Sequence, residues 1–201
     1  MIKIVFASTN PAKVEQIAGA LKGVANVTGV PKDINLPEVV EDGKTALENA
    51  RKKAVTYSKF LNSTVMSMDN ALYIEGLQPE QQPGLFVRSP PGANKRLNDD
   101  EMREYYIKLI ARLGGTARVS WDFAVCVATP DGKLQETVIK QYAELSSTPC
   151  IETLPGYPLD SLLVNPFTSK YVAQDSPKER AEFWEKTMGQ QLKQFIQQIE
   201  I

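Results

Sequence analysis

The first thirteen residues constrain the fold more than any other stretch of the chain. Residues 2–7 form a short, continuous apolar run, which is typical of a buried strand in a parallel sheet. The run ends in Ser8-Thr9-Asn10, and Pro11 then opens a helical pattern that places Lys13 in its first turn. Such a strand delivers the N-terminus of a helix, whose exposed N–H groups and dipole attract anions. Hydroxyl groups and a lysine beside that terminus indicate a phosphate-binding turn.

Composition excludes several other classes of protein. The net charge of −1 gives no overall attraction to nucleic acid or to an acidic membrane, so neither is an expected partner. No stretch is long or apolar enough to span a bilayer, and the strand after Met1 leaves no room for a signal peptide, so a cytoplasmic location is expected. The chain has no histidine, and hydrolytic chemistry would therefore need carboxylates, lysines, hydroxyls or a hard metal with oxygen ligands.

The order of the predicted elements indicates the fold class. The pattern gives strands at 2–7, 24–30 and 64–74, helices at 11–22, 45–60 and 98–113, a hairpin of strands at 117–128 and 133–145, and a last helix at 177–199. Strands that alternate with helices and end in a hairpin predict an α/β protein with an elongated central mixed sheet flanked by helices. No internal repeat or low-complexity linker divides the chain, so residues 1–201 are predicted to form a single domain.

Two acidic stretches are candidates for chemistry. The loop at 31–43 contains four carboxylates, and such clusters are mostly solvated, although one of them could face a metal. The strand at 64–74 is predicted to break at Asp69-Asn70 and then to resume. Carboxylates at strand ends are common places for chemistry in α/β folds, whereas the alternative is that the Asp-Asn pair only makes a turn.

Four segments follow one another in an order that is typical of one family. They are Ser8-Thr9-Asn10-Pro11-Ala12-Lys13, Glu48-Asn49-Ala50-Arg51-Lys52-Lys53-Ala54, Met68-Asp69-Asn70-Ala71-Leu72 and Pro83-Gly84-Leu85-Phe86. Together they resemble the inosine triphosphate pyrophosphatase family, which comprises the XTP/dITP, or non-canonical purine NTP, diphosphatases. The corresponding family patterns are Thr-Gly-Asn-x-x-Lys, Glu-Asn-Ala-x-x-Lys-Ala, Asp-Asp-Ser-Gly-Leu and a Pro-Gly element.

The resemblance implies a fold, an activity and an assembly. It implies an ITPase-like α/β fold of two lobes with a cleft between them, and it implies that two copies of the chain form a homodimer. It implies a nucleoside triphosphate diphosphatase that hydrolyses non-canonical NTP or dNTP to NMP and pyrophosphate. In the family, Mg²⁺ (or Mn²⁺ in its place) activates the water that attacks the α-phosphorus.

The resemblance also assigns roles to individual residues. Asp69 would be the general base or a metal ligand, and Lys53 would neutralise charge that develops on the bridging oxygens. Glu38, with Glu41 as the alternative, would bind the metal. The residues left are expected to contact the substrate: Ser8, Thr9, Asn10 and Lys13 at the phosphates, Asp160 at the base or ribose, and Arg88 in the loop at 78–98.

Departures from the family pattern leave two further hypotheses open. Met68 stands where the family has the first of two aspartates, and a thioether is a poor ligand for Mg²⁺. The segments that contact and read the base in the family are altered here to 158–161 and 186–188. The chain could therefore be a catalytically weakened nucleotide-binding or partner-binding protein, or a phosphate hydrolase for another substrate such as a modified pyrimidine nucleotide.

Overall fold

The computed structural model describes residues 1–31 and 33–200, which fold into two compact units. Unit 1 comprises Met1–Asn70, Asp122–Lys140 and Trp184–Ile201. Unit 2 comprises Ala71–Trp121 and Gln141–Phe183. The chain therefore passes between the units several times, and each is built from segments that are distant in sequence. The single domain over residues 1–201 and the cleft between two lobes stay predictions.

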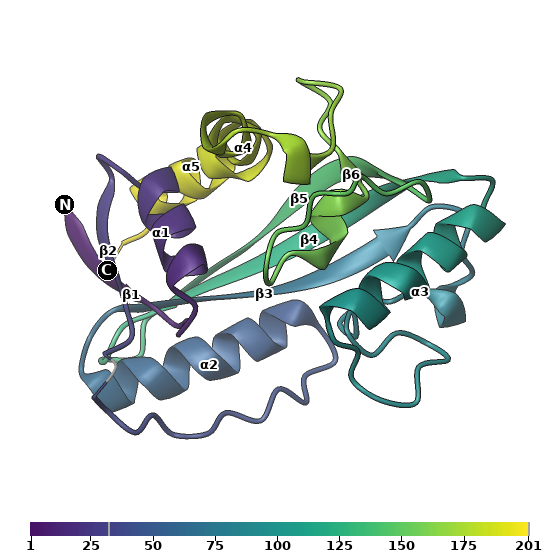
Figure 1. The fold of residues 1–201 in the computed structure, drawn as a ribbon. Coiled ribbons are helices and arrows are strands. Elements are labelled where there is room, and N and C mark those ends of the chain that lie inside the picture. Colours follow the sequence, from purple (N-terminus) through teal and green to yellow (C-terminus); the bar gives the residue numbers. More distant parts are fainter. Residues whose placement is uncertain (32, 201) are drawn as a thin grey trace. The chain divides into compact units, whose positions relative to one another are not determined.

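Strands and helices alternate through the first half of the chain, as the sequence predicts (Figure 1). Their bounds are β1 (Ile2–Phe6), α1 (Pro11–Ala20), β2 (Ala25–Gly29), α2 (Ala46–Leu61), β3 (Val65–Ile74), α3 (Asp99–Arg112), β4 (Thr116–Ala128), β5 (Leu134–Ser146), β6 (Leu163–Val164), α4 (Pro177–Trp184) and α5 (Gln190–Gln198). The strands form one sheet in the order β2-β1-β3-β4-β5-β6. Because β1 runs parallel to β2 and β3 while β6 runs antiparallel to β5, the sheet is mixed, which confirms the predicted α/β fold.

Unit 1 packs helices on both faces of its strands. Figure 1 shows α1 and α5 on one face and α2 on the opposite face. Ile4 and Phe6 of β1 are almost fully buried, whereas Lys3 is exposed and Val5 is partly exposed, as expected for a strand whose successive side chains alternate between faces. On α2, the small side chains Ala50 and Ala54 form a buried cluster with residues of β4. This close packing fixes α2 against the sheet and so fixes the polar groups at its N-terminal end.

Unit 2 is organised around α3. Asn98 caps this helix, because its side chain accepts a hydrogen bond from the Glu101 N–H and the Glu101 carboxylate accepts one from the Asn98 N–H (2.9 Å each). Tyr106 is fully buried and its hydroxyl donates to the Val87 carbonyl (3.0 Å), which ties the long loop at 78–98 to the helix. The helix also packs on the 3₁₀ turn Pro158–Ser161, where Asp160 lies.

Two elements differ from their prediction. The predicted break at Asp69-Asn70 is wrong, because β3 runs without interruption from Val65 to Ile74. Sheet pairing overrides the local turn signal, because β3 lies between β1 and β4 in the sheet. At its start, Phe6 lies opposite Met66, and the Ala7 N–H donates to the Met66 carbonyl (2.8 Å). The predicted last helix is interrupted by a π-helical turn at Glu185–Gly189 between α4 and α5. Among the described residues, no helix is both long and apolar enough to cross a membrane.

Candidate functional site

The turn after β1 gathers the predicted phosphate-binding groups at the start of α1. Ser8 Oγ accepts a hydrogen bond from the Asn10 N–H (3.2 Å), and the Asn10 carbonyl accepts from the Val14 N–H (3.1 Å), so Asn10 lies at the position of a helix cap. The side chains of Thr9 and Lys13 are exposed. The turn therefore presents hydroxyls and an ammonium group beside the N-terminus of a helix, an arrangement that favours anions.

Asp69 lies in the middle of β3 and is held by a side chain of α2. Asn49 Nδ2 donates to Asp69 Oδ2 (3.1 Å), and Asn49 is itself only 4% exposed. Burial raises the pKa of the Asp69 carboxyl above its ordinary value, and the hydrogen bond from Asn49 opposes this rise. The carboxylate is thus partly desolvated but keeps a donor that favours its charged form.

An ion pair between Glu41 and Lys53 lies in the same neighbourhood. The negative charge of Glu41 raises the pKa of Asp69, while the positive charge of Lys53 lowers it, so both side chains act on this carboxylate. Lys53 is one helical turn after Asn49 on α2, and the two therefore lie on the same side of the helix. The structure thus brings together three of the predicted residues, Asp69, Lys53 and Glu41.

The oxygen ligands at this site fit a hard divalent cation only in part. Asp69 and Glu41 offer carboxylates. The buried hydroxyl of Ser67 has no hydrogen-bond partner among the described residues. Ser67 lies on the same face of β3 as Asp69, because it is two residues before it in the strand. Glu38 is exposed, and the described part of the chain holds no cluster of three carboxylate or thiol ligands. Mg²⁺ commonly takes one or two carboxylates and completes its shell with water and substrate phosphates, so this donor set suits a cation shared with the substrate.

Met68 does not share the environment of Asp69. Neighbouring side chains of an extended strand point to opposite faces, and Asp69 faces α2 through Asn49. Met68 therefore lies on the other face, together with the fully buried Met66. By this alternation, a carboxylate at position 68 would point away from Asp69.

The remaining two predicted residues, Arg88 and Asp160, belong to unit 2. Arg88 forms an ion pair with Asp99 (2.7 Å), and the second carboxylate oxygen of Asp99 accepts a hydrogen bond from the Gly156 N–H (3.0 Å). Asp160 is 8% exposed, and burial raises its pKa to about 7, although the positive charge of Arg180 opposes this effect. Asp99 thus links the loop that carries Arg88 to the loop that leads into Asp160.

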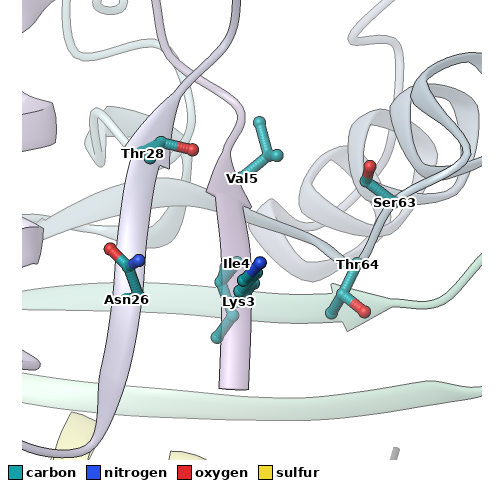
Figure 2. Close-up of a pocket in the computed structure, with 7 residues that line it drawn as sticks. All are labelled: Lys3, Ile4, Val5, Asn26, Thr28, Ser63 and Thr64. Atoms are coloured by element: carbon teal, nitrogen blue, oxygen red, sulfur yellow. The ribbon is translucent and has the colours of Figure 1, made fainter. Parts of the chain in front are cut away.

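A hollow in unit 1 lies apart from these residues. A cavity of about 370 Å³ is lined by Lys3, Ile4, Val5, Asn26, Thr28, Ser63 and Thr64. Figure 2 shows these residues around β1 and β2. The cavity lies beside β1 and β2 themselves, whereas the phosphate-binding turn follows the end of β1. None of the predicted site residues lines it.

Three residues that hold the site were not selected from the sequence. Asn49 contacts Asp69, Gly43 contacts Asn49, and Asp99 pairs with Arg88. Asn49 belongs to the Glu-Asn-Ala pattern, in which the resemblance assigns a role to Lys53 alone, and Asp99 lies at the start of a predicted helix. Their spacing along the chain carried no sign of these contacts, which depend on tertiary packing.

Comparison with known proteins identifies the family. Residues 4–187 match the model of the Ham1 family. A dITP/XTP pyrophosphatase of Staphylococcus aureus (strain MW2) is 30% identical over 185 residues, which cover 90% of this chain and 89% of the relative. One of Anaeromyxobacter sp. (strain Fw109-5) is 27% identical over 161 residues, covering 67% and 70%.

A solved structure agrees with these relatives. The Ham1 protein of Staphylococcus aureus superposes with a TM-score of 0.71 at 26% identity, and the match covers 96% of this chain and 97% of that one. The resemblance inferred from the sequence motifs is thereby confirmed. The chain belongs to the Ham1 family.

Proposed function

We propose that this protein hydrolyses non-canonical nucleoside triphosphates to the monophosphate and pyrophosphate. Family membership supports this function, since the relatives described above are named dITP/XTP pyrophosphatase. The observation that carries the proposal is the grouping of Asp69 with Lys53 and Glu41 in unit 1. A partly buried carboxylate beside a lysine is suited to activate water next to a phosphate chain.

The triphosphate would bind at the turn after β1. Ser8, Thr9, Asn10 and Lys13 offer hydroxyl, amide and ammonium donors at the N-terminus of α1, where the helix dipole also favours negative charge. Lys13 would compensate charge on the phosphate oxygens. This binding mode needs no positive charge elsewhere, which agrees with the net charge of −1.

Asp69 would orient a water molecule for attack on the α-phosphorus and would accept its proton as the new P–O bond forms. The bond from the α-phosphorus to the bridging oxygen breaks, and pyrophosphate leaves with the developing charge. Lys53 would stabilise that charge, for which it must release Glu41 in part. Mg²⁺ held by Asp69 and by Glu41 or Glu38 would lower the pKa of the attacking water and neutralise phosphate charge.

The base and ribose would be contacted from unit 2. Asp160, in its buried 3₁₀ turn, is the proposed contact to the nucleoside, and Arg88 is held by Asp99 in the loop that follows the Pro-Gly element. We also propose, from the family resemblance, that the protein is cytoplasmic and acts as a homodimer, and that Mn²⁺ can replace Mg²⁺. Sedimentation equilibrium and a metal panel test the last two points.

The alternative of a catalytically weakened binding protein has less support than it had from the sequence. It rested on Met68 and on the altered base-reading segments, and by the alternation of side chains along β3 Met68 faces away from Asp69. The carboxylate proposed as the base is present together with its neighbouring lysine. A binding protein would instead be stabilised by nucleotides without hydrolysing them.

The test is pyrophosphate release from a panel of standard and non-canonical nucleoside triphosphates, with Mg²⁺ or Mn²⁺. Wild type is compared with Asp69→Asn, which keeps the size of the side chain and removes its basicity. We expect the variant to lose about 10²–10⁴-fold in kcat while retaining its melting temperature, as for other positioned acid–base groups. Folded wild-type protein that releases no pyrophosphate from any of these substrates would disprove the proposal, and nucleotide-induced stabilisation without turnover would favour the alternative.

A further inference from the structure

The buried amide of Asn49 bridges two groups that come from different parts of unit 1. Its Oδ1 accepts a hydrogen bond from the Gly43 N–H (2.7 Å), and its Nδ2 donates to Asp69 Oδ2 (3.1 Å). The Gly43 N–H can only donate, so it fixes the orientation of the amide and turns the NH₂ group toward the carboxylate. One side chain therefore satisfies a loop donor and a strand acceptor together.

The loop approaches Asn49 so closely that only glycine fits at position 43. A Cβ atom at Gly43 would lie 2.5 Å from Asn49 Oδ1, 2.8 Å from Glu48 Cβ and 3.1 Å from the Asn49 backbone nitrogen. Real Cβ contacts are longer than this, and two of these atoms belong to the rigid part of α2. The absence of a side chain at Gly43 is thus a requirement of this contact.

The same loop carries Glu41, two residues before Gly43. Glu41 pairs with Lys53, which lies one turn after Asn49 on α2, and the Lys44 N–H donates to Glu48 Oε2 (2.7 Å). Asp42 also pairs with Lys52, so each of the loop residues from Glu41 to Lys44 is attached to α2. Through Asn49, this attachment continues by a hydrogen bond to the carboxylate of β3.

We propose that Asn49 is a positioning residue that holds Asp69 and the Glu41 loop in a fixed arrangement for the reaction. Its donor holds Asp69 Oδ2, while its acceptor keeps Gly43, and with it Glu41, next to the same carboxylate. The proposal deepens the proposed function and rests on it, because it treats Asp69 as the group that acts on the substrate.

Two substitutions separate the halves of the bridge. Asn49→Asp has the same shape and keeps the acceptor for Gly43, but it places a second carboxylate against Asp69. Gly43→Ala keeps the donor and disturbs the loop contact. Ser58→Ala is the matched control, because Ser58 is equally buried on α2 and its hydroxyl donates only within the helix, to the Val55 carbonyl (3.0 Å).

The experiment measures kcat and KM for the best nucleotide of the panel, and hydrogen exchange of the Gly43 amide without nucleotide or metal. We expect Asn49→Asp to lower kcat at least tenfold with KM within about threefold, and to leave the Gly43 amide protected. Gly43→Ala should lower kcat as well, and Asn49→Ala should speed exchange of the Gly43 amide at least tenfold. Ser58→Ala should match wild type in all three measurements.

Two results would overturn the proposal. One is kcat within twofold of wild type in a folded Asn49→Asp variant, and the other is unchanged exchange of the Gly43 amide in Asn49→Ala. If wild type itself hydrolyses no nucleotide, the proposed function fails and the role of Asn49 in turnover fails with it. That outcome is told apart from failure of the bridge alone, because exchange of the Gly43 amide is measured on the resting protein.

Discussion

Met68 and Asp69 are adjacent in sequence, yet they occupy opposite faces of β3. We therefore expect Met68→Asp to give no gain in pyrophosphate release, although it restores the aspartate pair of the family pattern. The new carboxylate would instead lie at the half-buried position 68, on the face that carries the fully buried Met66, at a cost of about 1–3 kcal/mol in the free energy of unfolding. Kinetics and urea unfolding of this variant test both points, and a several-fold rise in kcat would contradict the assignment of faces.

The buried carboxyl of Asp160 should make the free energy of unfolding depend on pH. Burial raises its pKa from 3.8 to about 7, so between about pH 4 and pH 7 the folded chain retains a proton that the unfolded chain has released. The stability that this group contributes is complete below about pH 4 and is lost as the pH rises to 7. Asp160→Asn should therefore stabilise the protein at pH 8, by at most about 4 kcal/mol, and this difference should shrink toward pH 4.

The measurement is urea unfolding of wild type and Asp160→Asn at pH 4.5 and pH 8. Asp33→Asn serves as the control, since it removes an exposed aspartate of the acidic loop. A difference between wild type and Asp160→Asn that is the same at both pH values would show that the buried charge is not its cause.

Among the elements, the sequence predicts those whose local pattern and packing agree. The strand-turn-helix at the start of the chain, α2 and α3 all follow from the periodicity of their apolar residues, and the structure adds the caps Thr45 and Asn98. The prediction was wrong where tertiary pairing opposes a local signal, as in β3, which continues through a turn-forming Asp-Asn pair.

The spacing of apolar residues near the end of the chain indicates that the last helix is interrupted. Phe183 and Met188 are both buried but are five residues apart, and five residues in an α-helix would turn the second side chain away from the first. The π-helical turn adds one residue at this place, with the Gln190 N–H bonded to the Glu185 carbonyl. A gap of five within an apolar stripe thus indicated the interruption between α4 and α5.

Two glycines with equally short contacts should respond differently to substitution. A Cβ atom at Gly189 would lie 2.5 Å from Glu185 Oε2, but this is the end of a flexible side chain that pairs with Lys193. Gly189→Ala gains up to about 1 kcal/mol of helix propensity and loses an ion pair worth about 0–1 kcal/mol, so its free energy of unfolding should stay within about 1 kcal/mol of wild type.

Gly43→Ala meets the buried Asn49 and the backbone of α2, which cannot move as easily. It should therefore be the more destabilising of the two substitutions, by at least about 1 kcal/mol. Urea unfolding of both variants under one condition makes the comparison. Equal losses would mean that the loop at Gly43 shifts as readily as the side chain of Glu185.

At the scale of the whole molecule, the predicted site residues divide between the two units. Unit 1 holds the phosphate-binding turn, the acidic loop, Lys53 and Asp69, whereas unit 2 holds Arg88 and Asp160. The sequence predicted these residues through short motifs, each of which is local. It did not predict the bridge through Asn49, because that contact joins a loop, a helix and a strand that are brought together only by folding.

This division predicts that the two units recognise different parts of the substrate. Inorganic tripolyphosphate lacks a nucleoside and should raise the melting temperature through the turn that contains Lys13, because binding to the folded state alone stabilises it. Lys13→Ala should weaken the stabilisation by tripolyphosphate and by a nucleoside triphosphate alike.

Asp160→Asn should retain the tripolyphosphate effect and lose the additional stabilisation that the nucleoside provides. Each ligand-induced shift is measured against the same variant without ligand, since Asp160→Asn changes the stability by itself. If Asp160→Asn instead abolished the tripolyphosphate effect, the phosphates would not be bound by unit 1 alone, and the assignment of Ser8, Asn10 and Lys13 would have to be revised.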